Sequence, residues 1–251
     1  MIEIKNINKS FGDNQVIFDV SAQFQTGHTN LIIGQSGHGK TVLLKTMVGL
    51  HSIDSGKIIY SDKVFSEMDF DDQKSIRKEI GMLFQGSALF DSLTVEENIR
   101  FPLDMFAEQS KEEKRERVNF CLKRVKLENV NHLYPSEISG GMQKRVAIAR
   151  AIALNPKYLF CDEPNSGLDP KTSIVIDNLI YEITKEYGIT TIINTHDMNS
   201  VMGIGEKIIF IYEGRKLWEG DKEDLLSASE ERLNDFVFAS ELFKRIKKNE
   251  K

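Results

Sequence analysis

The sequence predicts an α/β fold with a mainly parallel sheet flanked by helices. Short apolar runs that read as strands alternate with longer segments of helical periodicity. Four of these runs end in polar residues, and one of them leads into a glycine-rich loop followed by a helix. The carboxyl ends of parallel strands meet at one edge of a sheet, where ligands bind. The fold class therefore also predicts the position of the functional site.

Composition limits the classes of function. The chain has 251 residues, 40% hydrophobic and 28% charged, enough for one large domain or one domain with an inserted subdomain. A net charge of −5 argues against nucleic acid as the main partner. Two distant cysteines, Cys121 and Cys161, suggest a reducing, cytosolic compartment. We expect neither a signal peptide nor a membrane span, so another chain would have to anchor this one at a membrane.

The first 29 residues predict two strands. Alternating apolar and polar residues indicate strands over 2–7 and 16–24, joined by a turn over 9–13. Phe11 lies in that turn. It could stack on a purine base or close the end of a small sheet, and this stretch alone favours the second role.

The next segment contains a phosphate-binding motif. A short strand over 30–33 leads into GQSGHGKT and a helix over 41–50, and the loop fits the Walker A pattern G-x-x-x-x-G-K-[ST]. Its glycines, Gly34, Gly37 and Gly39, let successive backbone N–H groups face one anion. Lys40 would reach the β and γ phosphates of a nucleotide, and the Thr41 hydroxyl would bind Mg²⁺. The N-terminus of the helix adds its own attraction for phosphate.

The middle of the chain predicts a mostly helical insert over 86–156. It follows a strand over 57–60, a surface helix over 69–79 and a buried strand over 80–84 that ends at Gln85. A helix beginning near Thr94 should kink or stop at Pro102. An amphipathic helix follows over 111–126, and another begins at Ser139 and ends at Leu154.

Strands and helices alternate again after the insert. A buried strand over 158–161 ends in Asp162-Glu163-Pro164, and a strand over 190–194 ends in Thr195-His196-Asp197. Between them we expect a helix over 171–187, closed by Gly188. A hairpin over 207–212 and 215–219 and two or three helices over 222–251 complete the chain.

These motifs together resemble the ATP-binding cassette of ABC transporters over almost the whole chain. The phosphate loop, Gln85, Asp162-Glu163 and His196 occur in that family's order, and Gly167-Leu168-Asp169 resembles its D-loop. Ile138-Ser139-Gly140-Gly141-Met142-Gln143 resembles its signature, usually L-S-G-G-Q. The resemblance implies a P-loop NTPase fold with an N-terminal antiparallel β-subdomain, in which 1–85 and 157–220 form a RecA-like core, 86–156 a helical subdomain and 221–251 a C-terminal helical extension.

The resemblance also implies catalytic roles. Glu163 would act on the attacking water, His196 would contact the γ phosphate, and Gln85 would touch the water and the metal. Asp162 would hold Mg²⁺ together with Thr41 and Gln85. Alternatively, Glu163 caps a turn before Pro164, or His196 is an ordinary histidine at a strand end. The ATP-binding set implied by the family is Phe11, Gly34, Gln35, Ser36, Gly37, His38, Gly39, Lys40, Thr41 and Val42.

A second set would act on the ATP held by another copy of the chain. The resemblance assigns Ser139, Gly140, Gly141 and Asp169 to this role, so the active unit would be a homodimer that encloses two ATP molecules. Such dimers work with integral-membrane permease subunits. Met142 replaces the usual glutamine of the signature, and we expect activity to survive this change.

Within the family, the residues over 83–95 and 98–103, together with Met142, resemble the ATPase of Mla/Mce-type lipid transporters. That implies phospholipid cargo moved across or between bacterial envelope membranes, and a peripheral location at the cytoplasmic face of the inner membrane. A lipid-binding Mce-type subunit and a small regulatory subunit become candidate partners. Three alternatives stay open: an importer ATPase for amino acids or other small solutes, a soluble ABC ATPase, and a P-loop kinase or GTPase, against which the signature argues.

Overall fold

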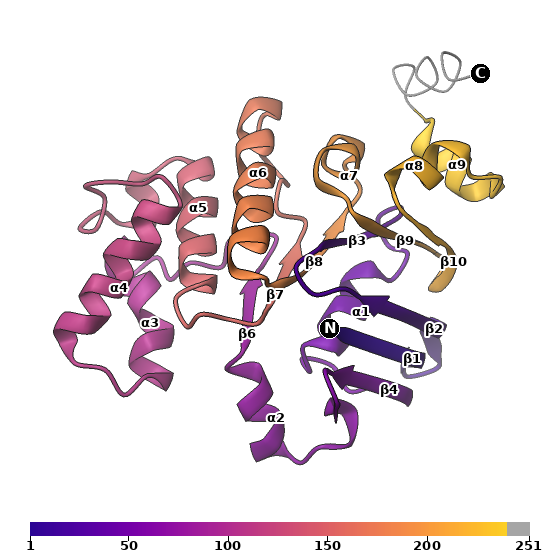
Figure 1. The fold of residues 1–251 in the computed structure, drawn as a ribbon, viewed down its shortest axis with the longest axis horizontal. Helices are drawn as coiled ribbons and strands as arrows, with labels where there is room; N and C mark the ends of the chain where they lie inside the picture. Colours follow the sequence, from indigo (N-terminus) through magenta and orange to yellow (C-terminus); the bar gives the residue numbers. More distant parts are fainter. Residues whose placement is uncertain (240–251) are drawn as a thin grey trace.

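Two β-sheets and the helices around them form the protein in this computed structural model, which describes residues 1–239 (Figure 1). One sheet has four strands in the order β2-β1-β4-β5, and the other has six in the order β10-β9-β3-β8-β7-β6. The strands are β1 (Ile2–Phe11), β2 (Asn14–Phe24), β3 (Thr29–Ile33), β4 (Ser55–Tyr60), β5 (Lys63–Val64), β6 (Ile80–Leu83), β7 (Tyr158–Asp162), β8 (Thr190–Thr195), β9 (Lys207–Tyr212) and β10 (Arg215–Gly220).

Helices cover the large sheet and extend to one side of it (Figure 1). They are α1 (Lys40–Met47), α2 (Phe70–Arg77), α3 (Val95–Phe106), α4 (Lys111–Arg124), α5 (Gly140–Ala151), α6 (Pro170–Tyr187), α7 (Met198–Ile204), α8 (Lys222–Ser227) and α9 (Glu231–Val237). Of two short 3₁₀ turns, η1 (Phe65–Glu67) lies between β5 and α2, and η2 (Pro135–Glu137) lies between α4 and α5. None of the helices within residues 1–239 combines the length and apolarity needed to cross a bilayer.

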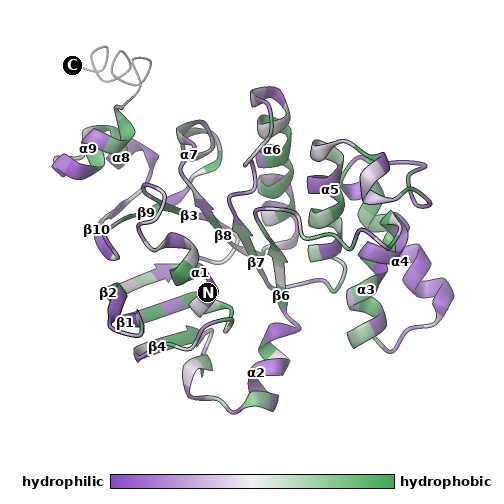
Figure 2. Cartoon of the chain, turned by 180° about the vertical axis from the view of Figure 1, so that it is seen from behind, coloured by the Kyte–Doolittle hydropathy of each residue, from purple (hydrophilic) through white to green (hydrophobic). Residues whose placement is uncertain are grey.

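The large sheet separates two hydrophobic cores. Its strands β6, β7, β8, β3 and β9 run parallel, and β10 closes the edge as an antiparallel hairpin partner of β9. Because side chains alternate along a strand, β7 sends Cys161 to one core and Phe160 to the other, and β8 does the same with Ile193 and Ile192. Burial on both faces explains why these strands are rich in apolar residues, drawn in green in Figure 2, although β8 also buries threonines and an asparagine. The predicted α/β class is confirmed.

The small sheet is antiparallel and packs over α1. Ile2 pairs with Phe24 of β2 and with Tyr60 of β4, and all three side chains lie in the core shared with α1. The predicted turn over 9–13 is wrong, because pairing continues to Phe11 opposite Asn14 and leaves a two-residue turn. Cross-strand pairs at the hairpin end therefore decide the strand length, rather than the loss of alternation in the sequence.

Helices α3, α4 and α5 pack against one another at one end of the large sheet (Figure 1). Thr94 and Ser110 start α3 and α4, each in a reciprocal cap with a glutamate three residues later. The expectation that Pro102 kinks or stops α3 is wrong about the stop, since the helix continues to Phe106. Buried Leu103 follows the proline, and packing of this apolar face offsets the missing backbone hydrogen bond.

The C-terminal part of the described chain contains two short helices. Asp221 caps α8, and Glu230 caps α9. Phe236 of α9 packs on Phe210 of β9, with ring centroids 5.7 Å apart, so α9 is attached to the large sheet. The remainder of the predicted helical region, from residue 240, lies outside the described residues.

Candidate functional site

Four strand ends meet at one cavity. The loop after β3, Gln85 after β6, Glu163 after β7 and His196 after β8 all line a cavity of about 350 Å³. The full lining is Val16, Ser36, Gly37, Gly39, Lys40, Thr41, Val42, Gln85, Glu163 and His196. The parallel order of β6, β7, β8 and β3 produces this convergence, as the sequence predicted. Val16 comes from the small sheet, and sequence reasoning missed it because a strand valine carries no motif.

The glycine-rich loop has a backbone that only glycine fits. Gly34 has a φ of 145°, and a Cβ there would overlap the Ile211 carbonyl oxygen of β9. Gly39 has a φ of 96°, and a Cβ there would press on the Ile17 side chain. Gly39 also occupies the N-cap position of α1. The loop is therefore held between two sheets with its helix N-terminus at the cavity.

Lys40 is held inside the loop. Its ammonium donates to the carbonyl oxygens of Gly34 at 2.8 Å and Gln35 at 3.0 Å. It lies 3.8 Å from a Glu163 oxygen, and only 5% of the side chain is exposed. Burial lowers the pKa of Lys40, while the nearby carboxylates of Glu163 and Asp162 act in the opposite direction. A phosphate would supply the strong acceptors that this buried cation lacks.

Two oxygen ligands suited to Mg²⁺ lie side by side. The Thr41 hydroxyl donates to Asp162 Oδ1 at 2.9 Å, and the buried Asn194 amide donates to the same oxygen at 3.1 Å. Within residues 1–239 there is no cluster of three or more His, Cys, Asp or Glu that could hold a metal alone. One carboxylate and one hydroxyl fit Mg²⁺, which completes its shell with phosphate oxygens and water. Gln85, the third predicted ligand, instead donates to Ser166 Oγ at 3.3 Å.

Glu163 and His196 form a direct pair at 2.9 Å through His196 Nδ1. The Glu163 side chain thus lies between the histidine ring and the Lys40 ammonium. It does not cap the turn before Pro164, the alternative that the sequence left open. Glu163 also has a φ of 48°, in the left-handed region that is strained for a non-glycine residue. Strain of this kind persists where the surroundings fix the backbone, as at functional sites.

The other predicted ATP-contacting residues lie around the cavity. Gln35 lines a neighbouring cavity of about 630 Å³ that Glu163 and His196 also border. The His38 ring packs edge-on against Tyr212, 4.8 Å between centroids. Phe11 lies outside the cavity lining, 46% exposed, with its ring edge-on to His51. Its exposure leaves the ring available for stacking.

The signature and D-loop residues do not reach this cavity. Ser139 caps α5 by accepting from the Met142 N–H, and Asp169 caps α6 by accepting from two backbone N–H groups. Gly141 faces Thr172, so the two helix N-termini lie side by side. None of the four predicted residues, Ser139, Gly140, Gly141 and Asp169, lines the phosphate-loop cavity. Within one chain the signature and D-loop residues are therefore separate from the phosphate loop.

Two cations on α5 hold the segment that begins at Gln85. Buried Lys144 donates from Nζ to the Gln85 carbonyl oxygen. Arg150 donates to the carbonyl oxygens of Ser87 at 2.8 Å and Ala88 at 2.7 Å. Sequence reasoning did not single out either cation. Lys144 gave one signal, a charged residue among the apolar positions of a predicted helix, but that signal does not identify a partner.

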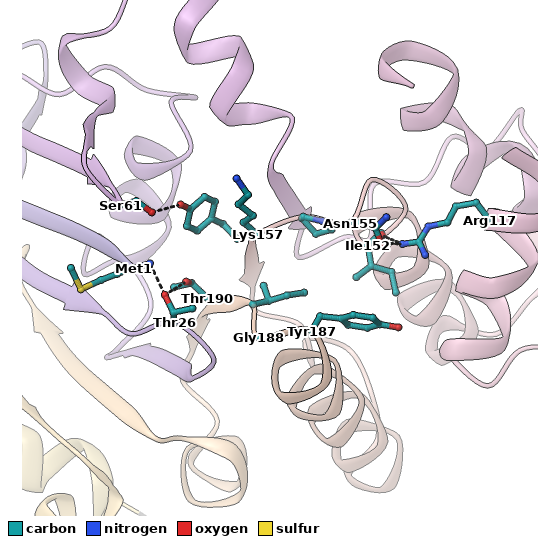
Figure 3. A pocket seen from close by; sticks show the side chains of 13 residues that line it. Met1, Thr26, Ser61, Arg117, Ile152, Asn155, Lys157, Tyr187, Gly188 and Thr190 are labelled. Carbon is teal, nitrogen blue, oxygen red and sulfur yellow. Dashed lines mark hydrogen bonds between the residues drawn. The ribbon is translucent and has the colours of Figure 1, made fainter. Parts of the chain in front are cut away.

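A further cavity of about 420 Å³ lies away from the phosphate loop (Figure 3). Arg117 and Asn155 of the helical segment line it together with Tyr187 of α6. Its polar groups are already paired with protein atoms: Arg117 bonds Asn155, and Ser61 bonds Tyr158. No predicted site residue lines this cavity.

Residues 17–166 match the ABC transporter family, and the chain belongs to that family. It is an ATP-hydrolysing subunit of an ABC transporter. It is 39% identical to the methionine import ATP-binding protein MetN of Clostridioides difficile, over 94% of this chain and 74% of that protein. It is 37% identical to the glutamine transport ATP-binding protein GlnQ of Escherichia coli, over 94% of this chain and 98% of that protein.

Solved structures show the same fold. The dimeric structure of MJ0796, a bacterial ABC transporter cassette, superposes with a TM-score of 0.81 at 34% identity, covering 88% of this chain and 98% of that one. The dimer of that cassette bound to ADP and Pi gives a TM-score of 0.80 at 34% identity, with the same coverage. The cbiO1 cassette of Clostridium perfringens gives 0.84 at 28% identity, over 99% of this chain and 98% of that one.

Proposed function

We propose that this chain hydrolyses ATP at the cavity below the loop after β3. Lys40 and the N-terminus of α1 bind the phosphates, and the Glu163–His196 pair positions and deprotonates the attacking water. The observation that carries this assignment is the geometry of Glu163, whose carboxylate lies beside Lys40 and bonds His196 at 2.9 Å. A water between Glu163 and a bound γ phosphate would lose its proton to the carboxylate, while the imidazole keeps the carboxylate in place.

Mg²⁺ fits beside this carboxylate. Thr41 and Asp162 would hold the ion, with Asn194 fixing the Asp162 orientation. When bound, the ion neutralises negative charge on the β and γ phosphates. Gln85 would then exchange its bond to Ser166 for a contact with the ion or the water. That exchange would transmit the state of the site to the segment that Lys144 and Arg150 hold.

The active unit in this proposal is a homodimer. Ser139 and Gly140 are exposed and lie outside the cavity that contains Lys40, so they require a second copy to meet an ATP phosphate. The dimeric MJ0796 structure, similar to this chain over 88% of its length, supports the same arrangement here. We also place the complex at the cytoplasmic face of the membrane, where a permease would receive the work of hydrolysis.

The Glu163→Gln variant tests the site and the dimer together. Glutamine keeps the shape of Glu163 but cannot take the proton, so we expect ATP to bind without turnover and to hold two copies together. Size-exclusion chromatography at saturating Mg-ATP should show a dimer, and a Lys40→Ala/Glu163→Gln double variant should stay monomeric. Wild-type rates of phosphate release from Glu163→Gln would show that another group acts as the base.

For the cargo, we infer import of amino acids or other small solutes. The support is the similarity to the methionine and glutamine transport ATP-binding proteins, which exceeds one third identity over 94% of this chain. A second candidate is phospholipid cargo, which the sequence motifs favoured. It rests on the residues over 83–95 and on Met142 in the signature.

Purification of the Glu163→Gln protein from its native membranes separates these two cargo classes. A permease accompanied by a solute-binding protein supports the small-solute importer. A permease accompanied by an Mce-domain protein and bound phospholipid supports the lipid transporter. In either case the hydrolytic site proposed here is unaffected, because the cassette does not contact the cargo. A preparation with no membrane partner would contradict both.

A further inference from the structure

A buried carboxylate is connected by hydrogen bonds to the segments that follow Glu163 and His196. Asp177 is on α6, eight residues after the D-loop aspartate, and is only 6% exposed. It lines none of the cavities described above and belongs to none of the family motifs in the sequence. A carboxylate in such a position costs free energy unless its surroundings give it donors. The hydrogen-bond partners of Asp177 therefore indicate its role.

One amide group connects Asp177 to both sides of the site. Asn165, two residues after Glu163, donates from Nδ2 to Asp177 Oδ1 at 2.8 Å. The same nitrogen donates to Ser200 Oγ at 3.0 Å. Ser200 is on α7, four residues after His196, and is 1% exposed. The segment that follows Glu163 and the helix that follows His196 are therefore fastened to α6 at one point.

Few charged groups act on Asp177. Burial raises the pKa of its carboxyl to about 6, the Ser200 and Asn165 hydrogen bonds oppose that rise, and Asp197 at the start of α7 adds to it. From β7 the neighbouring titratable group is the Cys161 thiol, whose own pKa burial raises far above neutrality. The buried Lys144 of α5 acts on that thiol. Within residues 1–239, Asp177 thus has two polar donors and no cation that offsets its burial.

We propose that Asp177 is a positioning residue for ATP hydrolysis: its carboxylate holds Asn165 and Ser200 together and thereby fixes the Glu163–His196 pair. The inference rests on the roles proposed above for Glu163 and His196. The strained φ of 48° at Glu163 needs a neighbouring anchor to persist, and Asn165 is the nearest side chain after Glu163 with such an anchor.

Protonation of Asp177 would release this anchor. The Asn165 Oδ1 atom is buried and has no hydrogen-bond partner among the described residues. A protonated Asp177 could donate to that oxygen if the Asn165 amide turned over, because amide nitrogen and oxygen are nearly equal in shape. The amide nitrogen would then point away from Asp177 and Ser200, and both hydrogen bonds that it now donates would be lost. The contact with Ser200 would persist only with the hydroxyl as donor, and the charge-assisted bond to Asp177 would be replaced by a weaker neutral one. The segment after Glu163 would therefore be held less firmly, and hydrolysis would fall in acid.

The pH profile of hydrolysis by the full-length chain tests this role. For wild type, kcat should fall as pH drops from 8 to 5, with a midpoint near 6 set by the pKa of Asp177. At one pH unit below that midpoint about a tenth of the groups stay ionised, so a roughly tenfold loss is expected. In Asp177→Asn, which keeps an acceptor oxygen but cannot titrate, the loss should shrink below about twofold. KM for ATP should stay within about twofold of wild type, because Asn165 and Ser200, which Asp177 holds, are outside the nucleotide-binding set.

A second variant keeps the proposal testable if Asp177→Asn does not fold. Ser200→Ala removes a donor that favours the ionised carboxyl, so the pKa of Asp177 and with it the acid midpoint should move to higher pH. The matched control is Asn178→Ala, an exposed neighbour on the same helix, which should keep the wild-type profile. Circular dichroism and thermal melts confirm that each variant is folded.

Some outcomes would overturn the inference. An unchanged acid midpoint near 6 in folded Asp177→Asn would show that Asp177 does not set it, and an unmoved midpoint in Ser200→Ala would lead to the same conclusion. Failure of the proposed site has a different signature, namely turnover by Glu163→Gln. The two ideas can thus fail separately.

Discussion

Replacing Asp177 by asparagine should raise the free energy of unfolding relative to wild type, and the gain should be larger at neutral pH than in acid. The carboxyl is 6% exposed and has no compensating cation within residues 1–239, so its charged form is costly in the folded state. Asparagine has nearly the same shape and keeps an oxygen to accept from Asn165. The substitution therefore removes mainly the charge.

The magnitude follows from two pKa values. The Asp177 pKa rises from an ordinary 3.8 to about 6 on folding, a difference worth roughly 3 kcal/mol at about 1.36 kcal/mol per pKa unit. Between these pH values the folded state binds more protons than the unfolded state, so the free energy of unfolding decreases as pH rises through this window. Of that total, roughly 1.4 kcal/mol falls between pH 5 and pH 8. Well below the unfolded pKa the difference vanishes, because both states are protonated.

Urea unfolding of both proteins at pH 5 and pH 8 measures this effect. Other carboxyls also titrate in this range, but they are common to both chains and cancel in the difference between the two midpoints. With an m value of about 3 kcal/mol/M, Asp177→Asn should gain roughly 0.5 M in midpoint relative to wild type on going from pH 5 to pH 8. If the amide changes the free energy of unfolding by a pH-independent amount, it shifts the urea midpoint of the variant equally at pH 5 and at pH 8. A midpoint gap that is the same at both pH values would refute the reasoning.

Three other substitutions test the phosphate loop. Lys40→Ala should weaken ATP binding at least about tenfold, because it removes the buried cation between Gly34 and Glu163; isothermal titration with Mg-ATP measures this, and retained wild-type affinity would contradict the assignment. Gly34→Ala should destabilise the fold by about 3 kcal/mol or more in urea unfolding, since its Cβ would overlap β9, whereas full stability would show that the loop can move aside. Thr41→Val should raise the Mg²⁺ concentration for half-maximal hydrolysis roughly tenfold; an unchanged Mg²⁺ requirement would place the ion elsewhere.

Much of the fold could be predicted from the sequence, because local chemistry and tertiary packing agree there. The phosphate loop shows why: its glycines serve the backbone turn, the anion and the packing between sheets at once. Strand β7 is another case, since burial on both faces leaves an unbroken apolar run that ends where Asp162 must be polar. In both places the residues of one short segment are enough to predict the local structure.

The wrong or missing predictions of secondary structure occur where local sequence and tertiary packing disagree. A proline inside a helix is unfavourable on local grounds, but α3 continues through Pro102 because the packing of Leu103 and Ile99 outweighs the missing hydrogen bond. Helix α7 was not predicted, because its seven residues make only about two turns, which is too short for a period to stand out, and the cap at Asp197 looks like the end of a strand motif. Short elements are fixed by contacts with distant parts of the chain, which a local pattern does not contain.

The residues of the site also fall into two groups, those that a local motif reveals and those that only tertiary packing brings together. Phosphate-binding and metal-binding residues generally occur in spaced motifs, because one backbone turn must present several groups to one anion. Sequence reasoning therefore singled out Lys40, Asp162 and Glu163, to which the proposed function assigns these roles. Asp177 has no such motif: it meets Asn165 and Ser200 only after α6 and α7 pack together, and each of the three is an ordinary helix or turn residue in the sequence. Its burial and raised pKa become visible only in three dimensions. A costly buried charge next to a strained backbone is therefore the kind of functional feature for which structure is indispensable.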